Sequence, residues 1–186
     1  MTLGWARQDV RMADVGNPWE TTTYGDPCRQ CAFFHTITRE AAVSVVVAIP
    51  DSLTELLSGK TGDERHRDLA WPVSAYVCHV GDNLRIWAER LAGVAQGGPR
   101  EIGGYDENML ATARNYERIP LAAALWSVRR AVADWREAIQ QASRMDVVLV
   151  HPERGELSVL DVVRSNAHDS THHQWDIRRS IEPPVQ

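Results

Sequence analysis

The spacing of hydrophobic residues changes near residue 38 and follows the period of an α-helix from there. Apolar residues then recur at intervals of three and four, which predicts a helix with Thr38 as its N-cap and Gly59 at its end. Pro50 falls inside this stripe, so we expect it to kink the helix or divide it into two pieces. The apolar positions of the stripe are Ala41, Ala42, Val45, Val46, Ile49, Leu53, Leu56 and Leu57.

Three later stretches have the same helical spacing. The second predicted helix lies within residues 71–94 with Pro72 in its first turn, and the third covers residues 120–139. The fourth begins at Ser158, which together with Asp161 three residues later resembles a capping box. Each long helix of about 20 residues would span about 30 Å. The sequence therefore predicts an all-α protein, an antiparallel four-helix bundle.

The segments outside these helices are shorter or less regular. Residues 1–35 have no sustained period and contain several glycines and prolines, which predicts an irregular N-terminal arm lying over a bundle domain of residues 36–182. A short additional helix is expected within residues 106–116. Residues 146–151 are extended and apolar, which fits either a strand or a buried connector.

Composition narrows the possible functions. Of the 186 residues 44% are hydrophobic and 24% are charged, which is typical of one soluble globular domain. The formal net charge of -5 argues against nonspecific binding of nucleic acid, which requires a basic surface. Neither a signal peptide within residues 1–20 nor an apolar run of membrane-spanning length is visible. We therefore expect a cytoplasmic protein that acts on a small molecule and binds neither nucleic acid nor a membrane.

Three histidines make the most definite chemical proposal in the chain. His168 and His172 are four residues apart in the fourth predicted helix, so they lie about one turn apart on one face and can bind the same metal ion. His79 lies in the second predicted helix. Three imidazoles on two antiparallel helices would leave open positions on a divalent metal, which is the arrangement of a catalytic metal site. His173 points about 100° away from His172, which predicts a surface residue or one that supports a ligand.

Several polar and aromatic residues are spaced so that they would lie near these histidines. Asp82 and Asn83 follow His79 by three and four residues, and a carboxylate that accepts the distal N–H of a ligand would fix its tautomer. Arg164 precedes His168 by one turn and could hold an anionic group. For the charged residues the alternative is a solvated charge or an ion pair within the helix. The candidates for metal support or substrate binding are Asp82, Asn83, Arg164, Asp169 and Trp175, and no catalytic residue is assigned beyond the metal ligands.

Cys28 and Cys31 form a Cys-x-x-Cys unit in the arm. No second pair of cysteines is present, so a separate zinc site with four sulfur ligands is excluded. Three alternatives stay open: the thiols pack the arm against the bundle, they form a disulfide after purification, or they form a mixed metal site with His35 and Cys78.

Two segments give the chain a resemblance to a known family. Trp71-Pro-Val-Ser-Ala-Tyr-Val-Cys-His79-Val-Gly-Asp82 and, much later, Ala167-His168-Asp169-Ser-Thr-His172-His173 resemble the DinB superfamily. This superfamily includes the mycothiol-dependent maleylpyruvate isomerases and the bacillithiol or mycothiol S-transferases. The segment Asp26-Pro-Cys28-Arg-Gln-Cys31 resembles the cysteine-containing arm of an actinobacterial branch. The resemblance implies a four-helix bundle in which His79, His168 and His172 hold a divalent metal, usually zinc and sometimes nickel.

Such a site would drive a bound thiol or water toward its anion near neutral pH. With the resemblance, this predicts a thiol S-transferase or isomerase that uses mycothiol or another low-molecular-weight thiol as cosubstrate. One alternative is a metal-dependent hydrolase or cyclase in a biosynthetic pathway, and another is a nonenzymatic metal-binding stress protein. Because members of this family often pair through helices, we also expect a homodimer.

Overall fold

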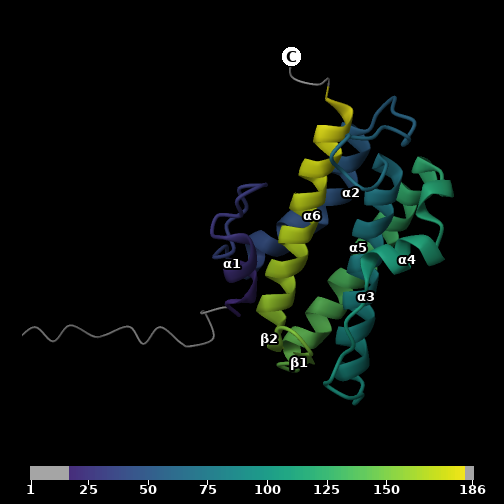
Figure 1. The fold of residues 1–186 in the computed structure, drawn as a ribbon. Coiled ribbons are helices and arrows are strands. Elements are labelled where there is room, and N and C mark those ends of the chain that lie inside the picture. The colour runs from purple at the N-terminus through teal and green to yellow at the C-terminus, as the bar shows by residue number, and fades with distance from the viewer. Residues whose placement is uncertain (1–16, 183–186) are drawn as a thin grey trace, which may run out of the picture.

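The computed structural model describes residues 17–182, and four long helices form a bundle in it (Figure 1). The prediction of an all-α four-helix bundle is confirmed, but the expected antiparallel arrangement holds only between two pairs of helices, because each pair itself is parallel. The first sixteen residues of the expected arm and the last four residues of the chain lie outside the described part. The bundle helices are α2 (Arg39–Leu56), α3 (Val73–Ala95), α5 (Leu121–Arg144) and α6 (Val159–Ile181).

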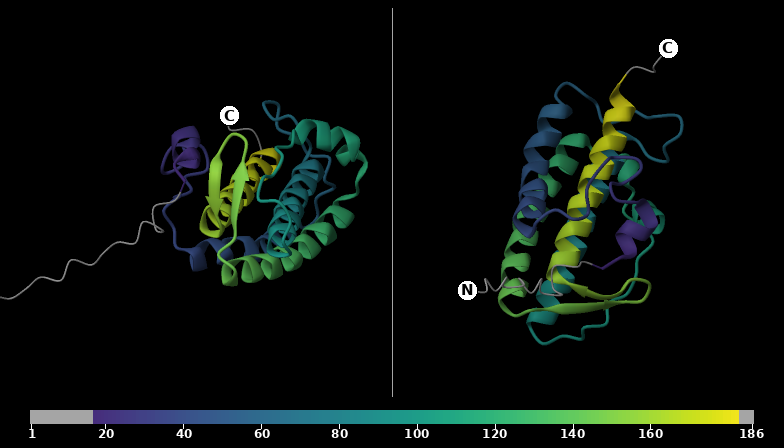
Figure 2. Two further views of the ribbon diagram at one scale, coloured as in Figure 1. Left: turned by 90° about the horizontal axis from the view of Figure 1, so that it is seen from below. Right: turned by 90° about the vertical axis from the view of Figure 1, so that its left-hand side faces the viewer.

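The bundle contains two pairs of parallel neighbours. α3 packs against α5 and α6, α6 also packs against α2, and α2 and α3 occupy opposite corners (Figure 2). Ile37, just before α2, accepts a hydrogen bond from Arg164 near the start of α6, and Ser52 contacts Gln174 further along both helices, so α2 and α6 run in the same direction. Ser74 and Leu121, at the starts of α3 and α5, both lie against Gly62, and Gly81 further along α3 lies against Val128 of α5, so α3 and α5 are also parallel. Asn83 contacts Asn166 and His79 contacts His173, so the two pairs are antiparallel to each other. Consecutive parallel neighbours require a long connection, and residues 96–120 supply it between α3 and α5. Residues 57–72 join α2 to α3, the antiparallel helix at the opposite corner.

The predicted helix starts agree with the structure. The Thr38 hydroxyl accepts a hydrogen bond from the Ala41 N–H, and Ser158 and Asp161 form the complete capping box at the start of α6. Pro50 lies inside α2, which continues through it without a break. None of the described helices is both long and apolar enough to cross a membrane.

Shorter elements close the ends of the bundle. The connection after α3 contains α4 (Glu107–Ala113) and a 3₁₀ turn at Tyr116–Arg118. Between α5 and α6, β1 (Val148–His151) pairs antiparallel with β2 (Gly155–Ser158), so the segment predicted as either strand or connector is a strand. In the arm, α1 (Trp19–Tyr24) lies beside α6 (Figure 2).

A chain of hydrogen bonds runs from the core to the bundle surface. The Trp135 Nε1–H donates to Asn166 Oδ1 at 2.8 Å, and Asn166 Nδ2 donates to Asn83 Oδ1 at 2.9 Å. Asn83 Nδ2 in turn donates to the hydroxyl oxygen of Tyr105 at 3.2 Å. Because Trp135 and Asn166 are fully buried, these bonds fix the rotation of α6 against α3 and α5.

Candidate functional site

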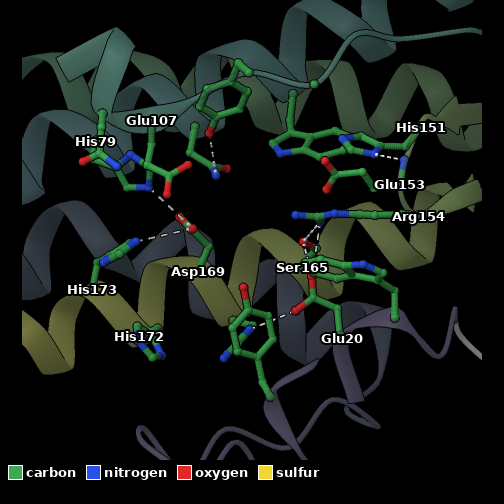
Figure 3. A pocket seen from close by; sticks show the side chains of 18 of the residues that line it. Glu20, His79, Glu107, His151, Glu153, Arg154, Ser165, Asp169, His172 and His173 are labelled. Carbon is green, nitrogen blue, oxygen red and sulfur yellow. Dashed lines mark hydrogen bonds and ion pairs between the residues drawn. The ribbon is translucent and has the colours of Figure 1, made fainter. Parts of the chain in front are cut away.

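A cavity of about 510 Å³ opens between α3, α6, the arm and the β hairpin (Figure 3). Its walls contain carboxylates, imidazoles, two arginines and aromatic rings. Five of the seven histidines of the chain line it, namely His79, His151, His168, His172 and His173.

One wall of the cavity brings together His79, Asp169 and His173. His79 comes from α3, whereas Asp169 and His173 are four residues apart on the face of α6 that packs against α3. Asp169 Oδ1 is 3.7 Å from His79 Nε2 and 3.6 Å from His173 Nε2 (Figure 3). One ligand atom from each of the three lies within 4.8 Å of the others. This set, here called the α3–α6 triad, has the composition of a two-histidine, one-carboxylate metal site.

The charges of the α3–α6 triad depend strongly on one another. Burial alone would lower the pKa of His173, but Asp169 and Asp176 raise it to about 9. Burial would likewise raise the pKa of Asp169, and His173 and His79 instead hold it well below its ordinary value. His173 Nδ1 lies 3.1 Å from Asp176 Oδ2, so Asp176 orients the ring with Nε2 toward the triad.

Two buried polar atoms of the α3–α6 triad lack a hydrogen-bond partner among the described residues, His79 Nδ1 and Asp169 Oδ2. Buried polar groups are nearly always satisfied. Asp169 Oδ2 belongs to the carboxylate that faces both histidines, so a metal ion held by Asp169 would give it a partner, whereas His79 Nδ1 is not the nitrogen nearest Asp169 and would need a different one. Imidazole nitrogen and carboxylate oxygen are both good ligands for zinc. The donor set therefore fits the divalent metal that the sequence predicts.

An adjacent face of the same stretch of α6, rotated by about 100°, contacts the arm. His168 Nδ1 is 3.0 Å from Glu20 Oε2, and Cys28 Sγ is 3.9 Å from His172 Nδ1. Ligand atoms of Cys28, Cys31, His168 and His172 lie within 4.8 Å of one another. Although burial would raise it, hydrogen bonds from the backbone of Cys31 and Gln30 lower the pKa of the Cys28 thiol to about 7. The arm cysteines thus meet the α6 histidines rather than His35 and Cys78.

The predicted ligands His79, His168 and His172 all line the cavity, but they do not form one close group. Within residues 17–182, no set of ligand atoms within 4.8 Å of one another includes all three. That ligand set stays a prediction. We expected His173 at the surface or in support of a ligand. It lies in the cavity wall next to His79, and the centres of the two imidazole rings are 4.6 Å apart.

Two of the five residues predicted to support the metal or bind substrate line the cavity, and three do not. Asn83 and Asp169 line the cavity. Asp82 lies outside the lining, because its carboxylate is buried and accepts from the Tyr116 hydroxyl and from Arg114 at 2.9 Å. Arg164 and Trp175 are also outside the cavity lining. Arg164 donates to the Ile37 carbonyl at 2.8 Å, and the Trp175 ring packs against the His172 ring with 5.7 Å between the ring centres.

The other end of the cavity is basic and aromatic, which sequence reasoning missed. The Arg154 guanidinium lies 4.0 Å from the centre of the Trp19 ring and donates to Ser165 Oγ at 2.9 Å. The Arg90 guanidinium lies 4.7 Å from the centre of the Trp87 ring, and no carboxylate of the described residues forms a salt bridge with it. Nothing in the local sequence marks these arginines, because a hairpin turn and a helix end bring them together only in the folded chain.

Comparison with known proteins identifies the family. The model of the DinB superfamily matches residues 50–177, which include α3, α5 and nearly all of α6. The chain belongs to the DinB superfamily. No curated protein matches it.

A solved structure supports the four-helix bundle fold. The chain is similar to YfiT from Bacillus subtilis, described as a probable metal-dependent hydrolase with an unusual four-helix bundle topology, with a TM-score of 0.61 and 15% identity over 76% of this chain and 83% of that one. At this identity the likeness shows the fold. The DinB match includes the α3–α6 triad, whereas Cys28 and Cys31 lie before its first residue.

Proposed function

We propose that this DinB protein is a metal-dependent enzyme that activates a thiol for attack on a small anionic electrophile. The observation that carries the proposal is the α3–α6 triad, three ligand atoms within 4.8 Å of one another on the wall of a cavity of about 510 Å³. His79, Asp169 and His173 would hold a divalent metal, for which zinc is the best match. A metal bound there would supply Lewis acidity and favour the anionic form of a thiol or water near neutral pH.

The protein's own residues would prepare the ligands. Asp176 orients His173, because its carboxylate lies 3.1 Å from Nδ1 and leaves Nε2 free for the metal. Asn83 is held by Asn166 and Tyr105 beside His79, so this wall of the cavity has little freedom to rearrange.

The basic end of the cavity would bind the anionic part of a substrate or of the thiol. Arg90 has no carboxylate partner among the described residues, and burial lowers its pKa, which makes an incoming anion a favourable partner. Trp19 and Trp87 form flat apolar surfaces beneath Arg154 and Arg90. A cavity of this size is in the range of drug-sized ligand sites, so a thiol and a small electrophile fit together.

Consumption of a low-molecular-weight thiol tests this proposal. The metal-loaded full chain should consume mycothiol or bacillithiol in the presence of an electrophile, and His173→Ala should reduce this at least about 100-fold through loss of a ligand. His66→Ala is the matched control, because His66 lies outside the cavity and bonds only its own loop. Thiol consumption that is unchanged in His173→Ala would refute the role of the triad.

Hydrolysis is the second candidate, with water in place of the thiol. It is favoured by the likeness to YfiT, a probable metal-dependent hydrolase. The same assay separates the two reactions, since a hydrolase turns over ester or amide substrates without added thiol and a transferase does not.

A further inference from the structure

Cys28, Cys31, His168 and His172 form a second cluster of ligand-type side chains, here called the arm cluster. The two cysteines belong to the loop after α1, and the two histidines lie one turn apart on α6. Their ligand atoms all lie within 4.8 Å of one another, and Cys28 Sγ approaches His172 Nδ1 to 3.9 Å. All three cysteines of the chain are free thiols, so no disulfide competes for these sulfurs.

An unsatisfied atom points to a ligand at the arm cluster. The His168 side chain is 4% exposed, and its Nε2 has no hydrogen-bond partner among the described residues. Its other nitrogen, Nδ1, is 3.0 Å from Glu20 Oε2. A carboxylate on one imidazole nitrogen and a free second nitrogen is the usual arrangement of a histidine that binds a metal.

The arm cluster and the α3–α6 triad share no residue. His168 and His172 form one i,i+4 pair, and Asp169 and His173 form another that is rotated by about 100° around α6. The first pair faces the arm and the second faces α3. A metal in one set therefore takes no ligand from the other.

We propose that the arm cluster binds a second metal ion, a structural zinc. Two sulfur and two imidazole ligands form the closed tetrahedral set of structural zinc sites, which leaves no position for a substrate. On binding, the Cys28 and Cys31 thiols release their protons to solvent and coordinate as thiolates. The ion fastens the arm to α6 and so holds Trp19, Glu20 and Tyr24 in the cavity wall.

Zinc content of variants tests this proposal. We expect two zinc ions per full-length chain purified with a reductant, one in Cys31→Ser, one in His173→Ala and none in the double variant. The loss in Cys31→Ser belongs to the arm cluster and the loss in His173→Ala to the triad, so the two proposals fail separately. Cys78→Ser is the matched control, because Cys78 is a buried thiol on α3 outside the cluster.

Two further measurements do not depend on how well a cysteine variant folds. In the unaltered protein, Cys28 and Cys31 should resist alkylation while zinc is bound and react after a chelator removes it. Cobalt-loaded His173→Ala should show sulfur-to-cobalt charge-transfer absorption. Full zinc content in Cys31→Ser, thiols that react equally with and without zinc, or a cobalt spectrum without sulfur bands would each overturn the proposal. So would loss of this zinc in His35→Gln together with its retention in Cys31→Ser, because His35 forms a separate close group with Glu20 and His168.

Discussion

Asn166→Ala should destabilise the protein far more than its small change in volume suggests. Asn166 is fully buried, where its Oδ1 accepts from Trp135 Nε1 at 2.8 Å and its Nδ2 donates to Asn83 Oδ1 at 2.9 Å. Removing the amide leaves a donor on Trp135 unpaired in the core and an acceptor on Asn83 unpaired at the buried cavity wall. A buried unsatisfied group costs about 1–3 kcal/mol, so the two together predict a loss of about 2–6 kcal/mol.

Denaturant unfolding followed by circular dichroism measures this loss. Asn108→Ala is the matched control, since Asn108 is exposed on α4 and should change the free energy of unfolding by about 0.5 kcal/mol or less. A double-mutant cycle with Trp135→Phe isolates the bond between Trp135 and Asn166, and we expect a coupling energy of about 1 kcal/mol. A loss below about 1 kcal/mol in Asn166→Ala, or no coupling in the cycle, would refute the reasoning.

Two further predictions concern the end of the bundle where the hairpin lies. Ser158→Ala removes the capping box with Asp161 and should lower the free energy of unfolding by about 1 kcal/mol, measured by denaturation against the unaltered chain. Burial and then Arg154 lower the pKa of His151, so its contribution to stability is complete above the ordinary pKa of about 6.5 and is lost as pH falls through the lower folded value. Between pH 7.5 and 5.5 the unaltered protein should therefore lose more stability than His151→Asn, by no more than about 1.4 kcal/mol, because asparagine can still accept from the Glu153 N–H without titrating. Equal losses in both proteins would contradict this.

The bundle helices could be predicted because their signals are local. Thr38 caps α2 and Ser158 caps α6 as their sequences indicate, since a cap involves only the next three residues. Which helices are neighbours is not a local property. The parallel arrangement of α3 and α5 depends on where the long connections cross the bundle, and no spacing of apolar residues encodes this.

The region of α6 that supplies the candidate metal ligands could be predicted from the sequence, but the particular residues that lie close to His79 could not. Around position 170, two i,i+4 pairs overlap with an offset of one residue, and both have metal-ligand spacing. Only the rotation of α6 decides which pair faces His79. That rotation is set by long-range contacts such as the bond of Asn166 to Asn83, so the sequence alone could not choose between His168 with His172 and Asp169 with His173.

The contacts of the arm suggest why one helix carries both pairs. Glu20 contacts His168 and accepts hydrogen bonds from Ser165 and Arg154, so a single arm residue touches the arm cluster, α6 and the basic end of the cavity. Since a zinc ion in the arm cluster would fix the arm against α6, it would also fix the position of Glu20 and, through it, of Arg154. The α3–α6 triad would keep its own ligands throughout, because Asp169 and His173 are rotated by about 100° from His168 and His172 on α6 and His79 lies on α3. The two proposed metals would then act on one cavity in different ways. The metal of the α3–α6 triad would take part in the chemistry, and the zinc of the arm cluster would hold the wall that the substrate contacts.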